Sequence, residues 1–201
     1  MQKALIFPPK MVDLQNYYYF KEGFSKEELD KIYNDVAFIP FQKAGTGESN
    51  ENEDTSVRSS QIKWVHATQE WSWLYDKLMA MIIEANNSLW NFHLYGALDA
   101  IQYTEYHASE NGHYGWHQDI GPGVLSTRKI SVTVQLSDPS EYEGGDLEYF
   151  KGGDPNSNAI KVDRHKGLVF IFPSFMMHRV TPITKGVRRS FVLWVGGEHY
   201  M

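Results

Sequence analysis

Three side chains suited to bind one metal ion stand in two stretches of the second half of the chain. His117 and Asp119 are two residues apart within residues 111–123, and His178 follows within residues 172–197. Side chains alternate between the faces of an extended strand, so His117 and Asp119 are predicted to point the same way. Two histidines and one carboxylate on one side of a metal form the facial triad of non-haem Fe(II) oxygenases. The pattern therefore predicts an iron site whose other side is open to O2 and a chelating co-substrate.

An arginine follows the second histidine at a distance that allows the chain to turn back. Arg188 lies ten residues after His178, and residues 181–186 between them are typical of a strand end and a turn. A guanidinium can hold a carboxylate through two parallel hydrogen bonds. A five-carbon keto-diacid would fit, with its keto-acid end on the metal and its far carboxylate on Arg188. Arg189 points to the opposite strand face, and spacing alone does not choose between the two arginines.

Two further histidines are alternative ligands. His113 lies four residues before His117, which is a helical metal-binding spacing, but two glycines in this stretch disfavour a helix. On a strand, His113 would share a face with His117 and could approach the site without binding the metal. His165 follows an aspartate by two residues, but it stands in a charged, turn-like stretch and is predicted to lie at the surface.

Composition limits the classes of protein that need to be considered. The chain has 201 residues, 42% of them hydrophobic and 22% charged, which is typical of a globular protein. A net charge of −6 argues against non-specific binding to nucleic acid. The absence of cysteine excludes disulfides and cysteine nucleophiles. The apolar run at the N-terminus is too short for a signal peptide and no stretch has membrane-spanning length, so we expect a cytoplasmic protein.

Two helices are predicted in the first half of the chain. Ser25 and Glu28 form a capping box that begins a helix extending to about residue 36. Residues 69–90 give the strongest helical pattern, because apolar side chains recur there at three- and four-residue steps. The recurring residues are Leu74, Leu78, Ile82 and Ala85. Residues 38–41 and 58–66 are predicted to be extended.

An acidic segment, residues 44–57, separates these elements. It has almost no apolar side chains and is predicted to be a loop. One interpretation is a solvated hairpin tip at the surface. The other is a lid that closes over a substrate, because loops longer than about 12 residues are uncommon unless they are functional or disordered.

Short strands dominate the second half. Candidates are residues 97–106, 113–117, 129–136, 146–150, 159–162, 167–172, 177–183 and 189–195, with turn residues between them. Closely spaced strands of this kind predict a β-sandwich or barrel, and a jelly roll has two such sheets. We expect a single domain over residues 1–201, mainly β with flanking helices. In it, helical and strand support (1–96) packs against a cupin-like catalytic jelly-roll core (97–197).

Four motifs of the second half form a recognisable set. They are His117-x-Asp119, the run LSDPxxYxGGxL within residues 128–150, the strand ending in Phe172-Pro173, and His178-Arg179-Val180-Thr181-Pro182 with Gly186-Val187-Arg188. In these motifs the chain resembles the PKHD-type hydroxylases, which belong with the prolyl 4-hydroxylase-like Fe(II)/2-oxoglutarate dioxygenases. The likeness is strongest over residues 102–197 and looser before them. Phe24-Ser25 and Arg58-x-Ser60 match more loosely.

The resemblance implies a double-stranded β-helix with His117, Asp119 and His178 on Fe(II). It implies Arg188 as the partner of the 2-oxoglutarate carboxylate. It also implies a co-substrate tyrosine on the strand before the metal pair. Tyr106 is favoured and Tyr103 competes, since the two face opposite ways on a regular strand. O2 is the second substrate, and L-ascorbate is an expected accessory. The 44–57 loop lies where related enzymes close over a peptide.

The implied activity is hydroxylation of a C–H bond, with release of succinate and CO2. The favoured substrate is a prolyl or other residue of a protein or peptide, and a free amino acid or other small molecule is the alternative. A nucleobase is disfavoured because there is no basic cluster. Candidate substrate residues are Arg58, Tyr114, Trp116 and Trp194, although the aromatic residues among them could equally belong to the core.

Other classes of protein are compatible with the same fold. One is a catalytically silent jelly roll that binds a metal or a peptide, and another is a metal-dependent isomerase or a sugar-binding jelly roll. An intact triad together with Arg188 argues against both of them. The sequence predicts no oligomeric state.

Overall fold

Short strands make up most of the computed structural model, which describes residues 16–44, 54–150, 152 and 158–199. The strands are β1 (Tyr18–Phe20), β2 (Gln42–Lys43), β3 (Arg58–Ser59), β4 (Gln61–Val65), β5 (Leu94–Ala97), β6 (Ile101–His107), β7 (His113–His117), β8 (Arg128–Gln135), β9 (Tyr142–Gly144), β10 (Leu147–Phe150), β11 (Ala159–Lys161), β12 (Val169–Pro173), β13 (His178–Val180) and β14 (Ile183–Gly197). The helices are α1 (Lys26–Val36) and α2 (Ser72–Leu89), with 3-10 turns η1 (Ala108–Glu110), η2 (Gly123–Thr127) and η3 (Pro139–Glu141). Most of the predicted 44–57 loop lies outside the described residues.

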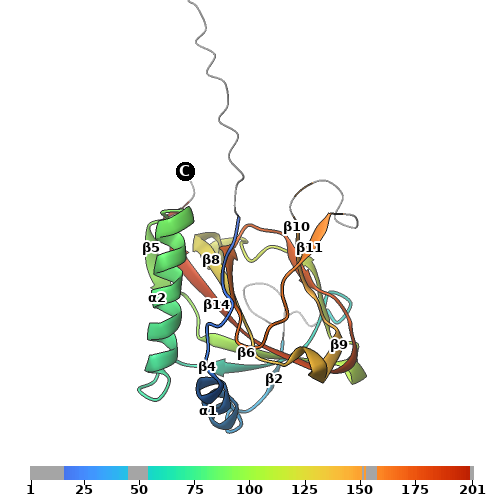
Figure 1. Cartoon of the computed structure of the whole chain (residues 1–201). Coiled ribbons are helices and arrows are strands. Elements are labelled where there is room, and N and C mark those ends of the chain that lie inside the picture. Colours follow the sequence, from blue (N-terminus) through green and yellow to red (C-terminus); the bar gives the residue numbers. More distant parts are fainter. Residues whose placement is uncertain (1–15, 45–53, 151, 153–157, 200–201) are drawn as a thin grey trace, which may run out of the picture.

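The strands form two antiparallel sheets. The larger sheet has the order β1-β12-β8-β14-β6-β4-β2, and the smaller has the order β11-β10-β13-β7-β3. Figure 1 shows α2 on one side of the molecule and β10 and β11 on the other, with the larger sheet between them. This is the mainly β, double-stranded β-helix architecture that was predicted, with helices packed against one face. In the described part of the chain, no helix combines the length and apolar character needed to cross a membrane.

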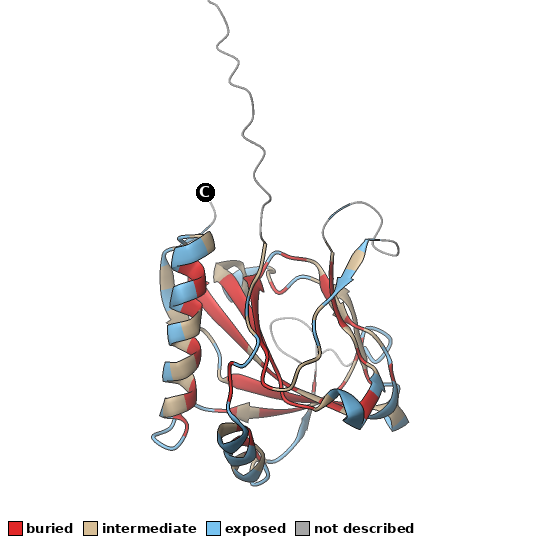
Figure 2. Cartoon of the chain, viewed as in Figure 1, coloured by how far each residue is buried: buried red, intermediate tan, exposed pale blue. Residues whose placement is uncertain are grey.

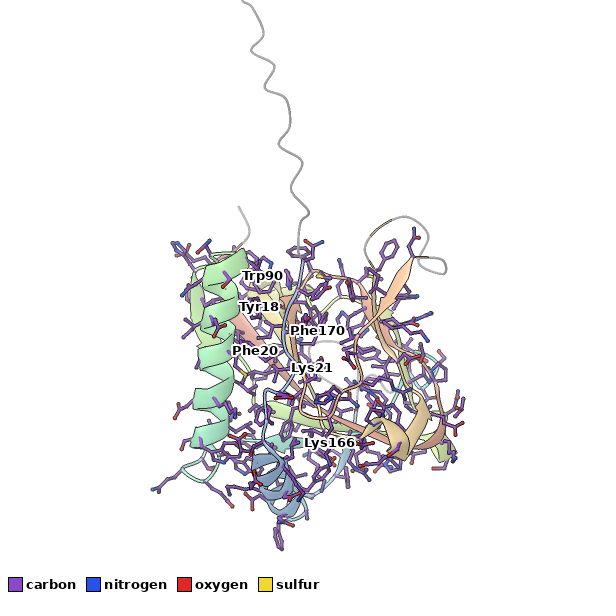
Figure 3. The ribbon with its side chains drawn as sticks, viewed as in Figure 1. Tyr18, Phe20, Lys21, Trp90, Lys166 and Phe170 are labelled. Atoms are coloured by element: carbon purple, nitrogen blue, oxygen red, sulfur yellow. The ribbon has the colours of Figure 1, made fainter. Side chains whose placement is uncertain are left out.

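Both predicted helices are confirmed. The capping box of α1 is present, with Ser25 and Glu28 each bonding the other's backbone N–H. Helix α2 buries the predicted apolar stripe against the larger sheet and turns its exposed residues away from it (Figure 2). Tyr18 and Phe20 of β1 pack against the same core beside α2 (Figure 3). Helix packing therefore covers the outer face of the sheet and leaves its inner face to the smaller sheet.

Several predicted strands differ in their bounds from those observed, and two of the differences have a clear cause in the backbone. Residues 38–41 are not a strand, because the backbone N–H groups of Phe38 and Ile39 bond back to the end of α1 and continue its turn. The extended segment begins only at β2. Residues 177–183 divide between β13 and the start of β14, because Pro182 has no N–H to continue the ladder of β13. Strand β14 is correspondingly long and pairs with β8 on one side and β6 on the other.

Leu78 provides a test of the helix–sheet core. Its side chain is fully buried in α2, whereas Ile83 on the same helix is 50% exposed. Leu78→Ala should lower the free energy of unfolding by about 2–5 kcal/mol, because it removes buried apolar contacts and leaves a cavity. The matched control Ile83→Ala should change it by roughly 0.5 kcal/mol or less. Urea unfolding measures both, and equal losses would show that α2 does not pack as described.

Candidate metal centre

Three side chains from separate parts of the chain converge between the two sheets. His117 ends β7 and His178 begins β13, and the two residues face each other in the antiparallel register of these strands. Asp119 lies just beyond β7. Its Oδ1 is 3.7 Å from Nε2 of His117 and its Oδ2 is 3.5 Å from Nε2 of His178. One ligand atom from each residue lies within 4.8 Å of the others, so the three can hold one metal ion.

The two imidazole rings are oriented by backbone carbonyls. Nδ1 of His117 is 2.8 Å from the carbonyl oxygen of Gly115, and Nδ1 of His178 is 2.8 Å from that of Met176. A carbonyl only accepts, so each Nδ1 carries the hydrogen and donates it. Each Nε2 is then left with a lone pair for a metal.

The charge states of the triad also suit metal binding. Burial, followed by the neighbouring His178, lowers the pKa of His117 to about 3, so its ring is neutral at physiological pH. Burial alone would raise the pKa of Asp119. The two histidines and a hydrogen bond from Ser131 outweigh that effect and hold the pKa of this carboxyl below its usual range. A neutral imidazole and an ionised carboxylate are the forms that bind metal.

A bulge in β7 changes which side of the strand its side chains point to. Two residues lie between Tyr114 and His117, opposite the single residue between His178 and Val180. The extra residue turns Tyr114 to the same side as His117, and their rings stack with centroids 3.5 Å apart. The expectation of strict alternation along this stretch was therefore wrong.

The same irregularity takes His113 away from the metal centre. Its two ring nitrogens lie 2.7 Å and 3.1 Å from the backbone carbonyl oxygens of Asn111 and Ser56. It is not part of the ligand cluster. Asp119, for its part, lies past the end of the strand rather than on it.

A cavity leads from the triad to Arg188, which is only 2% exposed. The guanidinium makes a long hydrogen bond of 3.4 Å to Ser190 Oγ and lies 5.7 Å from the ring of Tyr106, its partner across β14 and β6. Within the described residues no carboxylate pairs with it. A buried charge without an opposite charge is unfavourable, so this end of the cavity fits an anionic ligand.

The cavity also decides between the two arginines and the two tyrosines that the sequence left as alternatives. Arg189 points to the outer face, where its Nε donates to Glu105 at 2.9 Å. Tyr103 is on that face too, and its hydroxyl donates to the same carboxylate at 2.7 Å. Arg188 and Tyr106 line the cavity instead.

The glycine pair in the Tyr-x-Gly-Gly run makes room for Arg188. Gly145 has a φ of +61°, a conformation that glycine adopts without strain. A Cβ at this position would come within 2.0 Å of Ile183 Cδ1 and 3.2 Å of Arg188 Cδ. The guanidinium stem can therefore lie against bare backbone.

The candidate substrate residues divide into two groups. Arg58, Tyr114 and Trp194 line both the cavity and an outer cleft that continues from it. Trp116 lines neither of these hollows. Its ring packs edge-on against Phe150 and lies under Arg179, whose guanidinium carbon is 4.6 Å from the ring centre.

Sequence reasoning missed several residues of the site. Arg128 lies 4.1 Å over the ring of Trp194 and forms a 2.8 Å ion pair with Asp99 at the cleft. Ser131 and Thr133 of β8 lie beside the metal centre and the cavity respectively. The alternation of polar and apolar residues in Lys-Ile-Ser-Val-Thr-Val-Gln-Leu was a signal for these two, since the polar positions face inward.

Comparison with known proteins finds a family similarity in the second half of the chain. A model of the 2OG-Fe(II) oxygenase superfamily matches residues 101–196. The resemblance to PKHD-type hydroxylases is confirmed: this part of the chain is similar to a PKHD-type hydroxylase of Teredinibacter turnerae, 36% identical over 42% of this chain and 38% of the relative. It is also similar to that of Parvibaculum lavamentivorans, 39% identical over 43% and 39%. The chain thus spans about two-fifths of the length of the curated relatives it matches.

Solved structures share this fold across most of the chain. A Trichoplax adhaerens prolyl hydroxylase in complex with a hypoxia inducible factor peptide fragment superposes with a TM-score of 0.71, covering 90% of this chain and 84% of that one at 16% identity. A viral collagen prolyl hydroxylase from Paramecium Bursaria Chlorella virus-1, in a 2OG complex, gives 0.66 over 92% and 98% at 18% identity. At these identities the likeness establishes the fold.

The lowered pKa of His117 predicts how the metal-free protein responds to acid. Below pH 6.5 the unfolded chain takes up a proton at this residue while the folded chain does not, so stability falls as pH falls through this window. Between about pH 7.5 and about pH 5.5 the loss from this group should be about 1 kcal/mol. Urea unfolding at both pH values should show that the free energy of unfolding depends less on pH in His117→Gln than in the wild type. An equal dependence in both proteins would contradict this assignment.

Proposed function

We propose that the protein is an Fe(II)- and 2-oxoglutarate-dependent dioxygenase that hydroxylates a C–H bond. The observation that carries this proposal is the buried Arg188 at one end of a cavity whose other end is the His117–Asp119–His178 cluster. A metal site alone would serve many functions. A metal site joined to an enclosed guanidinium fits a ligand with a chelating group at one end and a carboxylate at the other.

Each residue of the cavity has a separate role in this proposal. His117, Asp119 and His178 hold the metal from one side. Arg188 binds the far carboxylate of 2-oxoglutarate, and Tyr106 supports it with its hydroxyl. When bound, Fe(II), 2-oxoglutarate and O2 supply the oxidation, which releases succinate and CO2 and leaves a hydroxyl group on the substrate.

The walls around these groups keep water out. Leu147, Val180 and Val192 line the cavity between the triad and Arg188. Phe172 packs edge-on against His178, with ring centroids 4.8 Å apart. An apolar lining strengthens the ion pair that Arg188 would make, because the local dielectric constant is low.

We propose a prolyl or other residue of a protein or peptide as the substrate. Tyr114 and Trp194 stand where the cavity opens into the cleft, and flat aromatic faces suit an apolar ring. Arg58 lies 4.8 Å over Tyr114 and donates a 2.7 Å hydrogen bond to Gln102, which keeps this wall in place. Structural neighbours that are prolyl hydroxylases, one of them with a bound peptide fragment, support the choice.

The remaining expectations belong to the same proposal. L-Ascorbate is an accessory reductant, the protein acts in the cytoplasm, and residues 1–201 work as a single domain. The alternative is a jelly roll that binds a metal or peptide without turnover, or an oxygenase that acts on a small molecule.

Anaerobic titration with Fe(II) and 2-oxoglutarate tests the metal and co-substrate sites. The wild type should give the weak visible charge-transfer band of the chelate, and His178→Ala should abolish it. Arg188→Ala should need roughly 30-fold more 2-oxoglutarate or more, since losing one partner of a buried ion pair costs about 2 kcal/mol or more.

The matched control is Arg189→Ala on the opposite face of β14, which should titrate like the wild type. Absence of the band in metal-loaded wild type would refute the oxygenase assignment and favour the binding-protein alternative.

Succinate formation with proline-containing peptides tests the substrate class. Trp194→Ala should lower kcat/KM for a responsive peptide by roughly 10-fold, because an aromatic anchor at an interface contributes more than about 1 kcal/mol. The control Trp116→Ala, on the other side of the small sheet, should stay within about 3-fold of wild type. Turnover of free amino acids but of no peptide would instead identify a small-molecule oxygenase.

A further inference from the structure

Asp119 needs an anchor that the two histidines do not need. His117 and His178 are held by the ladder between β7 and β13. Asp119 lies beyond β7, in a bend that belongs to no strand. Its backbone N–H donates to the carbonyl oxygen of Ser174 at 2.9 Å, and its own carbonyl accepts from Arg128 at 3.3 Å. Backbone contacts fix its position but leave the rotation of its carboxylate free.

The carboxylate is fixed by two buried hydroxyl groups. Ser131 Oγ lies 2.6 Å from Asp119 Oδ2, and Ser174 Oγ lies 2.9 Å from Ser131 Oγ. Both serines are fully buried. Ser131 comes from β8 and Ser174 follows β12, so two neighbouring strands of the larger sheet supply the pair.

Counting protons gives these hydrogen bonds a direction. An ionised carboxylate only accepts, and each hydroxyl has one hydrogen to donate. Ser131 must therefore donate to Asp119, which leaves its oxygen to accept from Ser174. The contact of 2.6 Å is in the range of a charge-assisted O–H···O⁻ bond. The chain of donors runs from Ser174 to Ser131 to Asp119 Oδ2.

We infer that Ser131, supported by Ser174, is a positioning residue that holds the carboxylate of Asp119 toward the metal position. The inference rests on the proposed function. Oδ1 faces Nε2 of His117 at 3.7 Å and Oδ2 faces Nε2 of His178 at 3.5 Å, and Ser131 fixes this rotation of the carboxylate by donating to Oδ2.

A fixed carboxylate matters for the chemistry proposed above. Two imidazoles and one carboxylate held on one side of a metal would leave its other side for a chelating keto acid and O2. A carboxylate free to rotate would hold the metal less tightly and could crowd the co-substrate.

Two measurements on purified, metal-depleted protein test the inference. The first is the dissociation constant for Mn(II) alone, by electron paramagnetic resonance. Ser131→Ala should raise it about 10-fold or more, because loss of a group that orients a metal ligand typically costs 10- to 100-fold in affinity. Ser131→Thr keeps the hydroxyl and should stay near wild type. Ser174→Ala should raise it less, by about 3-fold, and it supplies the test should Ser131→Ala fail to fold.

The second measurement is the 2-oxoglutarate dependence of the charge-transfer band in Fe(II)-loaded protein. Ser131→Ala should need several-fold more co-substrate at saturating metal. The matched control is Ser137→Ala, which removes another fully buried hydroxyl, one that bonds the backbone of Val187 and Arg189 away from the metal centre. Ser137→Ala should change neither measurement.

The outcomes separate this inference from the proposed function. The role of the hydroxyl is overturned if folded Ser131→Ala binds Mn(II) as tightly as the wild type. It is also overturned if Ser131→Thr binds Mn(II) no more tightly than Ser131→Ala. Either result holds even if the wild type gives the charge-transfer band. Ser131→Ala could raise the Mn(II) dissociation constant while Fe(II)-loaded wild type gives no charge-transfer band with 2-oxoglutarate. That result supports the ligand-positioning role of Ser131 and refutes the oxygenase assignment. Failure of the wild type to bind Mn(II) overturns both.

Discussion

The buried charge of Arg188 is the constraint on which the rest of the site depends. A guanidinium 2% exposed and without a carboxylate partner among the described residues is unfavourable until a ligand supplies the opposite charge. Its position is therefore tightly specified. The aromatic ring of Tyr106 lies on the neighbouring strand, Ser190 accepts a hydrogen bond from its guanidinium, and Gly145 leaves space for its stem. Stability gained elsewhere, in the helix-backed core, offsets this unfavourable arrangement.

That offset is possible because β14 and β8 each contribute one face to the core beneath the helices and the other face to the cavity. In β14 the side chains of Phe191, Leu193 and Val195 pack into the core beneath the helices, while Arg188 and Trp194 point into the cavity. Strand β8 divides in the same way, with its apolar positions in the core and its polar ones facing inward. The polar groups of the inner face are satisfied by one another, as Ser131 and Asp119 are, or are left for a ligand.

The predictable part of the structure came from local rules. Capping, apolar steps of three and four, and strand alternation identified α1, α2 and most strands, and the residue types of the triad pointed to a metal. Alternation failed in β7, because the bulge beside Tyr114 depends on pairing with β13 and no local pattern encodes it. The choice of Arg188 over Arg189 likewise needed the inner and outer faces of β14 to be known. Arg128 gave no signal, since its partners Asp99 and Trp194 are distant in sequence.

The shared strands limit how this protein can change over evolution. A substitution on the cavity face of β8 or β14 can alter what is bound while the core beneath the helices keeps its shape. An inserted or deleted residue in the middle of either strand does something different: every later side chain changes sides, so that core leucines and valines enter the cavity and polar groups enter the core. New specificities in such a domain should therefore arise by exchange of residues within these strands, and changes of length should collect in the connections between them.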